Sequence, residues 1–277
     1  MFFIINDIIL NIEFLTIIMA SPDTVPEKLD SPINYKILAL IVGSAIAFHF
    51  SLTFLFVPEQ SDAIISVVSF INPLAAAIAG LFVAKRYFGT MVFGKSYLLL
   101  SLGFLSVFLG EVAYLIYDLI LNIEPYPSIA DIFFFAYSPF LILHLIINIR
   151  FFQASTNVIT KVWVILIPSI IIVIYALISF SELGEANFDF YYGSIFVAAT
   201  SITLSLTILG AKIFKQGLLG LSWLILLFGV LSLTFADDWY YYLEILGSYD
   251  LSHPVNILWY AGYWIVVYAL IKHKQII

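Results

Sequence analysis

The stretch LGFLSVFLGEVAYLIYD, residues Leu102–Asp118, combines a long apolar run with two carboxylic acids. It belongs to the run Ser96–Ile120, which exceeds the roughly 20 residues that a helix needs to cross about 30 Å of hydrocarbon. Seven further runs of similar character follow or precede it. The sequence therefore predicts an all-α, multi-pass membrane protein with about eight transmembrane helices, over Lys36–Val57, Asp62–Ala84, Ser96–Ile120, Asp131–Ile149, Lys161–Phe180, Phe190–Gly210, Leu218–Leu243 and Val255–Ile271.

The charges between these runs alternate in sign along the chain. All eleven Lys and Arg residues lie before odd-numbered runs or after even-numbered ones, and loops after odd-numbered runs carry acids only. Because basic loops stay on the cytoplasmic side of a membrane, we expect both termini in the cytoplasm of a cell-membrane protein. The outward-facing acids are then Glu59, Glu124, Glu182, Glu185, Asp189 and Asp250.

The composition excludes several classes of function. At 63% hydrophobic and 10% charged residues, the chain is too apolar for a soluble domain. The net charge of −7 and the scattered bases do not suggest nucleic-acid binding, and the absence of cysteine excludes disulfides and thiol chemistry. Without a nucleophile–base pair, a phosphate loop or a metal-protease spacing, we expect neither an enzyme nor a cofactor.

Three segments are predicted: a leader over residues 1–34, a first four-helix unit over 35–152 and a second over 161–272. Within the leader, Met1–Ala20 is apolar but interrupted by Asn6, Asp7, Asn11 and Glu13. We interpret it as a peripheral, interfacial segment, with a ninth helix or a true start at Met19 as alternatives.

The two four-helix units resemble each other. Placed above Leu102–Asp118 at a constant shift of 126, Phe228–Glu244 (FGVLSLTFADDWYYYLE) repeats its spacing and residue types. This predicts a parallel 4+4 repeat related by an axis along the membrane normal, with the third and seventh helices near the centre. The matched pairs are Gly103 and Gly229, Ser106 and Ser232, Gly110 and Ala236, Glu111 and Asp237, Tyr114 and Tyr240, and Asp118 and Glu244; one deletion later, Asp131 meets Asn256 and Ala136 meets Ala261.

Acidic side chains occupy matching faces of the third and seventh helices. Carboxylates inside a membrane cost about 3 kcal/mol on insertion scales and usually face the bundle interior. No Lys or Arg lies in the outer half of the predicted bundle, which excludes a salt bridge. The acids are therefore protonated, hydrogen-bonded by nearby tyrosines, or neutralised by an external cation. The candidate binding residues are Glu111, Tyr114, Asp118, Asp131, Asp237, Asp238, Trp239, Tyr240, Glu244 and Asn256.

A structural interpretation stands beside the functional one for each group. For Glu111 and Asp237 a polar core and a cation site remain equal alternatives, whereas the polar core is favoured for Asp118 and Glu244, which lie closer to water. Ser128 and Asp131 match a capping box that starts a helix. For Asn256, after Pro254, a helix-start role is likewise favoured.

Other polar and aromatic residues receive modest interpretations. His49 and His144 are interpreted as hydrogen-bonded interior residues, and His273 as an interfacial residue without a specific role. Trp239, Trp259 and Trp264 are candidates for the wall of a site beside the acids, and core or lipid packing is the alternative.

One resemblance is carried by Gly110-Glu111 with Tyr114, by the segment Pro125–Phe134 (PYPSIADIFF) and by Tyr137. These residues resemble the multi-helix membrane sensor region that precedes bacterial diguanylate cyclase, cyclic-di-GMP phosphodiesterase and histidine kinase domains. Phe235–Asp238 and Asn256–Tyr260 resemble the weaker second copy of that motif. The resemblance implies a sensing module, but it carries over no ligand and no catalytic residue, and this chain shows no output domain.

The sequence thus predicts a receptor-like or sensory membrane module with an outward-facing acidic and aromatic pocket. It would respond to a cation, an amine or a proton and signal through a separate cytoplasmic or membrane partner, with the lipid bilayer as its surroundings. A small cation transporter or channel is one alternative. A non-catalytic accessory subunit of a larger membrane complex is another.

Overall fold

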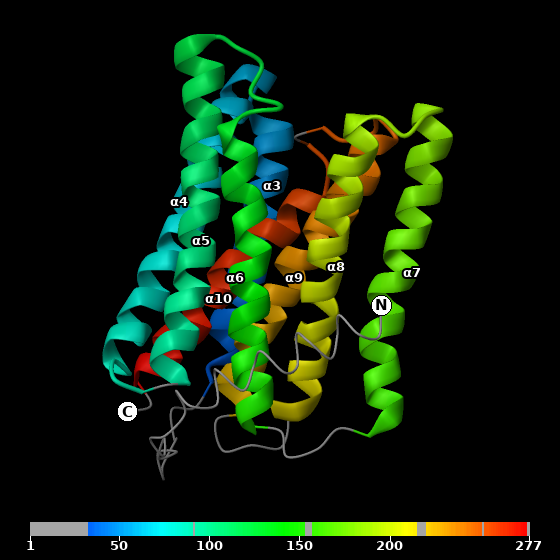
Figure 1. The fold of residues 1–277 in the computed structure, drawn as a ribbon. Coiled ribbons are helices and arrows are strands. Elements are labelled where there is room, and N and C mark those ends of the chain that lie inside the picture. Colours follow the sequence, from blue (N-terminus) through cyan, green and yellow to red (C-terminus); the bar gives the residue numbers. More distant parts are fainter. Residues whose placement is uncertain (1–32, 91, 153–156, 215–219, 251, 276–277) are drawn as a thin grey trace.

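The computed structural model describes residues 33–275 except 91, 153–156, 215–219 and 251 (Figure 1). Of the predicted leader only Ile33 and Asn34 fall in this range, so the interpretation of Met1–Ala20 lies outside the described residues. The described part is all-helical, and eight of its helices are long and apolar enough to span a membrane. They are α3 (Tyr35–Leu55), α4 (Pro58–Arg86), α5 (Phe93–Leu115, extended by the π-helical η1, Ile116–Leu121), α6 (Ile129–Phe152), α7 (Val158–Leu183), α8 (Phe188–Phe214), α9 (Gly220–Ile245) and α10 (Val255–Gln275).

The predicted eight apolar helices are therefore confirmed, and local signals account for several helix ends. Asn34 and Asn157 cap α3 and α7 by accepting hydrogen bonds from the backbone N–H groups of Lys36 and Thr160. Pro58 stands in the first turn of α4. Gly184, at φ 72°, ends α7 in the left-handed conformation that glycine adopts without strain.

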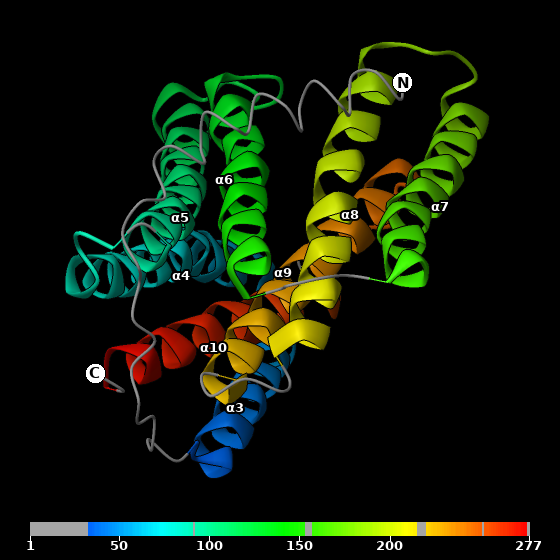
Figure 2. The same ribbon diagram turned by 60° about the horizontal axis from the view of Figure 1, so that its bottom comes forward.

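Six helices form a closed ring in which each packs against the next. The order is α4, α5, α6, α8, α9 and α10, and α10 returns to α4. Within the ring, the first four helices thus meet the last four along two seams, α6 with α8 and α10 with α4. Figure 2 shows α4, α5 and α6 together on one side of the bundle and α7 and α8 on the other.

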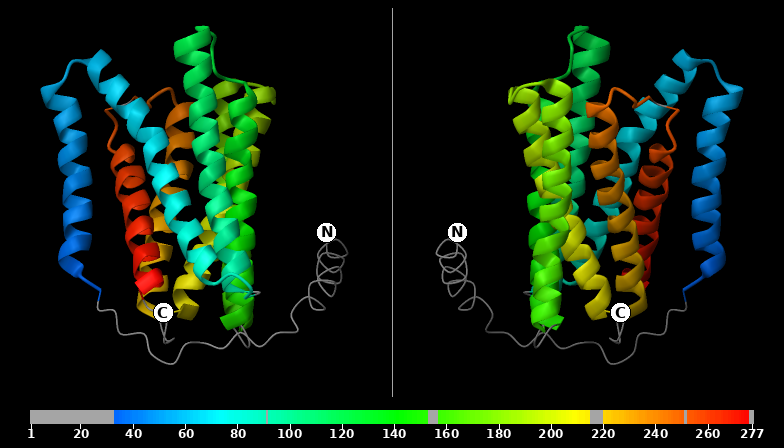
Figure 3. Two further views of the ribbon diagram at one scale, coloured as in Figure 1. Left: turned by 90° about the vertical axis from the view of Figure 1, so that its left-hand side faces the viewer. Right: turned by 90° about the vertical axis from the view of Figure 1, so that its right-hand side faces the viewer.

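The remaining two helices lie outside this ring. α3 packs mainly on α10 and stands at the edge of the bundle, whereas α7 packs mainly on α8 (Figure 3). Only 17% of the most apolar stretch of each is buried in the protein, against 61% for α9 and 56% for α10. Their remaining apolar surface suits contact with lipid tails.

The ring interior is filled by large apolar side chains and depends on close helix contacts. Leu100, Phe104, Leu141 and Leu226 have no exposed surface. α9 and α10 come close together at Gly229, because small residues let helix backbones approach each other in a membrane. A Cβ atom added at Gly229 would lie 2.7 Å from a Val266 methyl group and 2.9 Å from the Val266 nitrogen.

We expect Gly229→Leu to destabilise the bundle by about 2 kcal/mol or more, since the added side chain meets backbone that cannot move without separating α9 from α10. Chemical or thermal unfolding of the purified protein in detergent measures the loss. Gly43→Leu on α3 is the matched control, because a Cβ atom there meets nothing within 4 Å. Equal stability of the two variants would contradict this account of the α9–α10 contact.

Candidate functional site

Glu111 lies on α5, Asp237 lies on α9, and Tyr263 lies on α10. Both acids lie close enough to Tyr263 to act electrostatically on its hydroxyl group. Each side chain is enclosed by protein on most sides yet keeps part of its surface accessible.

Aromatic groups surround Asp237. The indole N–H of Trp259 donates a hydrogen bond of 2.9 Å to its Oδ1 atom. The Trp259 ring contacts Tyr240 at 5.6 Å, and Tyr240 in turn contacts Tyr249 at 4.8 Å between centroids. Of the three tryptophans considered as wall residues, Trp259 is thus the one bonded to an acid.

Trp239 takes a different position. Its ring is 38% exposed and lies against His253 on the loop before α10, with 5.4 Å between centroids. Successive residues of a helix point about 100° apart. Trp239, two residues after Asp237, therefore points away from it. Tyr240, three residues after Asp237, points to the same side and contacts Trp259.

Asp238 faces a different helix from its neighbour Asp237. It is only 5% exposed and accepts a hydrogen bond of 2.5 Å from the hydroxyl of Thr200 on α8. Its second oxygen, Oδ2, is buried without a hydrogen-bond partner among the described residues. The sequence analysis assigned the two adjacent acids to one site. In the structure Asp237 is hydrogen-bonded to α10, whereas Asp238 is hydrogen-bonded to α8.

Tyr114 lies near the end of α5, Asp118 lies in η1, and Glu244 lies near the end of α9. The carboxyl groups of Glu111, Asp118 and Glu244 all lie within electrostatic range of the Tyr114 hydroxyl. Tyr114, Asp118 and Glu244 are themselves exposed. These residues form an exposed rim at the end of the bundle where α5 and α9 end.

Asp131 and Asn256 lie at the starts of α6 and α10 and are held by other groups. Asp131 accepts the backbone N–H of Ser128 at 2.6 Å, as in the predicted capping box, and the hydroxyl of Tyr192 at 2.6 Å. Asn256 accepts the hydroxyl of Tyr249 at 3.2 Å. One carboxyl oxygen of Asp131 therefore caps α6, and the other connects α6 to α8.

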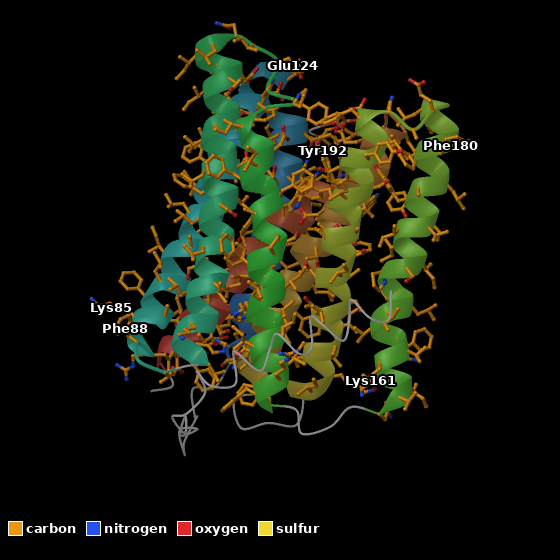
Figure 4. The ribbon with its side chains drawn as sticks, in the orientation of Figure 1. Lys85, Phe88, Glu124, Lys161, Phe180 and Tyr192 are labelled. Carbon is orange, nitrogen blue, oxygen red and sulfur yellow. The ribbon has the colours of Figure 1, made fainter. Side chains whose placement is uncertain are left out.

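The outer loop between η1 and α6 reaches α8 through a second tyrosine. The Tyr126 hydroxyl donates to Asp189 at 2.9 Å. Burial and this hydrogen bond to a carboxylate raise the pKa of Tyr126 above its usual value, so the hydroxyl remains a donor at neutral pH. Figure 4 shows Glu124, from the same loop, and Tyr192 toward the same end of the bundle.

Sequence reasoning missed a second group of polar residues, at the opposite end of the ring. Ser96, Tyr97, His144 and Asn148 gather there with His273, and all are at most 1% exposed. His144 is hydrogen-bonded, as predicted. His273, predicted at the membrane interface without a specific role, lies at the end of the last apolar span, and its side chain is buried in the protein. A signal was available, since the shift of 126, or 125 after the deletion, pairs Tyr97 with Trp223 and Asn148 with His273.

No protein-family model, no curated protein and no solved structure matches this chain. The resemblance to sensor regions therefore stays a prediction. Within the described part of the chain, no group of three or more His, Asp or Glu residues is placed to hold a metal ion.

We expect Thr200→Val to cost about 1–3 kcal/mol of stability, because it removes the donor to the buried carboxyl group of Asp238. The double variant Thr200→Val/Asp238→Leu should recover part of that loss, since neither polar partner is then left alone. Unfolding midpoints in detergent measure both effects.

Thr203→Val is the control for this prediction. Thr203 is equally buried, but its hydroxyl bonds only the Ala199 carbonyl of its own helix, at 2.9 Å. A loss from Thr203→Val as large as that from Thr200→Val would show that the Asp238 contact has no special role.

Proposed function

We propose that this chain is a receptor-like module of the cell membrane that responds to a cation, an amine or a proton at an outward-facing acidic and aromatic site. The observation that carries the proposal is the site of Asp237, a partly buried carboxyl group that accepts the Trp259 indole N–H at 2.9 Å beside the rings of Tyr240 and Tyr249. Glu111, its counterpart on α5, is likewise only partly exposed. The outer half of the described bundle holds no Lys or Arg to neutralise them. Trp259 and Tyr240 add aromatic faces, which attract organic cations.

The proposal includes a parallel repeat of two four-helix units. Equivalent contacts support it: Gly103 packs against Leu141 of α6, and Gly229 packs against Val266 of α10, and these partners are also 125 residues apart. Tyr97 and Trp223, paired by the shift of 126, contact each other at 5.5 Å between α5 and α9. The outer helices depart from this symmetry, because α3 packs on α10 whereas α7 packs on α8.

A repeat of this kind offers a physical route from the outer site to the inner surface. A cation that bridges acids on α5 and α9 would draw the two units together along the α6–α8 and α10–α4 seams. A separate partner would read that shift at the short basic loops, and the chain itself would act without catalysis or a cofactor.

A second candidate, a small cation transporter, gains support from the buried polar residues at the inner end. Sequence reasoning found the inner half too apolar for an inward path. Tyr97, His144, Asn148 and His273 supply polar groups there, about four helical turns from Glu111 along α5. Transport would then need only a movement of the apolar layer around Phe104.

The receptor proposal is tested by thermal unfolding of the purified protein with a panel of inorganic cations and amines across pH. We expect one of these to stabilise the wild-type protein, by about 2.7 kcal/mol at 100 times its Kd. The gain should vanish in Glu111→Gln/Asp237→Asn, which removes both charges at nearly constant shape.

Asp118→Asn/Glu244→Gln removes two charges from the exposed outer rim and is the matched control, so it should keep most of the response. If the wild-type protein and Glu111→Gln/Asp237→Asn respond alike to every cation, the acidic site is not a receptor site.

The proposed orientation is tested with single cysteines, since the natural chain contains none. The two substitutions are Ser181→Cys and Phe88→Cys. Ser181 lies in the last turn of α7, next to the acidic loop that follows. Phe88 lies near the basic loop after α4 (Figure 4). A membrane-impermeant maleimide added to intact cells should label Ser181→Cys and leave Phe88→Cys unlabelled until the cells are opened. The reverse pattern would place the acids in the cytoplasm.

A further inference from the structure

The inner end of the ring contains a closed polar and aromatic group, here called the inner cluster, with no carboxylate among its members. Its side chains come from α5, α6, α9 and α10 and are at most 1% exposed. The members are Ser96, Tyr97, His144, Asn148, Trp223 and His273.

The rings of the inner cluster contact one another across the bundle. Tyr97 and Trp223 are 5.5 Å apart between centroids. His144 contacts both of them, at 5.7 and 5.6 Å, and His273 contacts both, at 5.5 and 5.4 Å. Each histidine therefore packs against the same tyrosine–tryptophan pair.

Backbone carbonyl groups determine which nitrogen of each imidazole carries hydrogen. Nδ1 of His144 lies 2.8 Å from the Ser96 carbonyl oxygen, and Nδ1 of His273 lies 2.7 Å from that of Ala269. A carbonyl oxygen only accepts, so Nδ1 is the donor in both rings, and the Ser96 hydroxyl oxygen, 2.7 Å from Nδ1 of His144, is then a second acceptor there. In the neutral imidazole the other nitrogen, Nε2, then presents a lone pair.

These lone pairs belong to a set of buried acceptors. Nε2 of His144, Nε2 of His273 and Oδ1 of Asn148 have no hydrogen-bond partner among the described residues, and neither has the Tyr97 hydroxyl. The Asn148 amide group is oriented by its own donors, which bond the Ser96 hydroxyl and the His144 carbonyl. Leaving such groups unbonded costs about 1–3 kcal/mol each, so this geometry favours a bound donor.

The chemistry of the acceptors narrows the class of that donor. Hard cations such as Na⁺ and Mg²⁺ prefer several oxygen ligands, and two of the acceptors are imidazole nitrogens. A divalent ion would also find no carboxylate in the inner cluster. The N–H groups of a monovalent ammonium ion match lone pairs on nitrogen and oxygen, and the rings of Tyr97 and Trp223 lie in the same cluster.

We propose that the inner cluster is a binding site for ammonium or a small protonated primary amine. The inference deepens the transporter candidate, on which it rests for its physiological role but not for binding itself. A cation released from the outer acids would meet the inner cluster before it reached the inner surface.

The test is a titration of the full-length protein in detergent, labelled with ¹⁵N in histidine, with ammonium chloride and methylammonium chloride. The Nε2 signals of His144 and His273 should shift with both salts and not with sodium chloride at equal ionic strength. His49, also buried at 2% exposure but on α3, should not respond.

Three further arms make the result decisive. His144→Phe should weaken binding about 10- to 100-fold, as expected for loss of a hydrogen bond to a charged group, whereas His49→Phe should bind normally. If His144→Phe does not fold, Tyr97→Phe, which removes only a hydroxyl, should weaken binding in its place. Absence of a shift in the wild-type protein, an equal shift with sodium, or a shift with Zn²⁺ alone would overturn the proposal.

The same titration on Glu111→Gln/Asp237→Asn separates this inference from the receptor proposal. Retained shifts at His144 and His273 in that variant support a distinct inner site, even if the outer acids prove not to bind a cation. Loss of those shifts would overturn a separate inner site.

Discussion

Carboxyl groups lie between the helices of an apolar bundle whose outer half, within the described residues, holds no basic side chain to neutralise them. Neutral donors take that role: the Trp259 indole for Asp237, the Thr200 hydroxyl for Asp238 and the Tyr192 hydroxyl for Asp131. Each donor lies on a different helix from its acid. Burying an unbonded polar group in a membrane is costly. These hydrogen bonds therefore stabilise the contacts of α9 with α10 and α8, and of α6 with α8.

The residues inside the ring change in character along the length of the helices. Acids and tyrosines occupy one end, the side chains of Leu100, Phe104 and Leu226 fill the middle, and the inner cluster occupies the other end. Such an arrangement separates two polar compartments by an apolar layer. A change in helix packing is then needed to connect them, which suits either a receptor that transmits a shift or a transporter that opens in turn.

Helix number and the face of each helix that carries acids were predictable, because both depend on length, hydropathy and the period of 3.6 residues. The Ser128–Asp131 cap was also predictable, since its hydrogen bonds span only three residues. The partner of Asp238 was not, because Thr200 lies 38 residues away on α8. The contacts of His273 were not predictable for the same reason, because Trp223 and Tyr97, which bury it, lie on other helices.

The sequence by itself determined that eight apolar helices form, where the charges between them lie and which residues of α5 and α9 are acidic. Those properties follow from local composition and from the cost of placing charge in hydrocarbon. Only the tertiary structure decided that Asp237 and Asp238 face different helices and that two histidines pack against one tyrosine–tryptophan pair. A helical period orders the faces of a single helix, whereas the neighbour that each face meets is chosen by how whole helices pack into the ring.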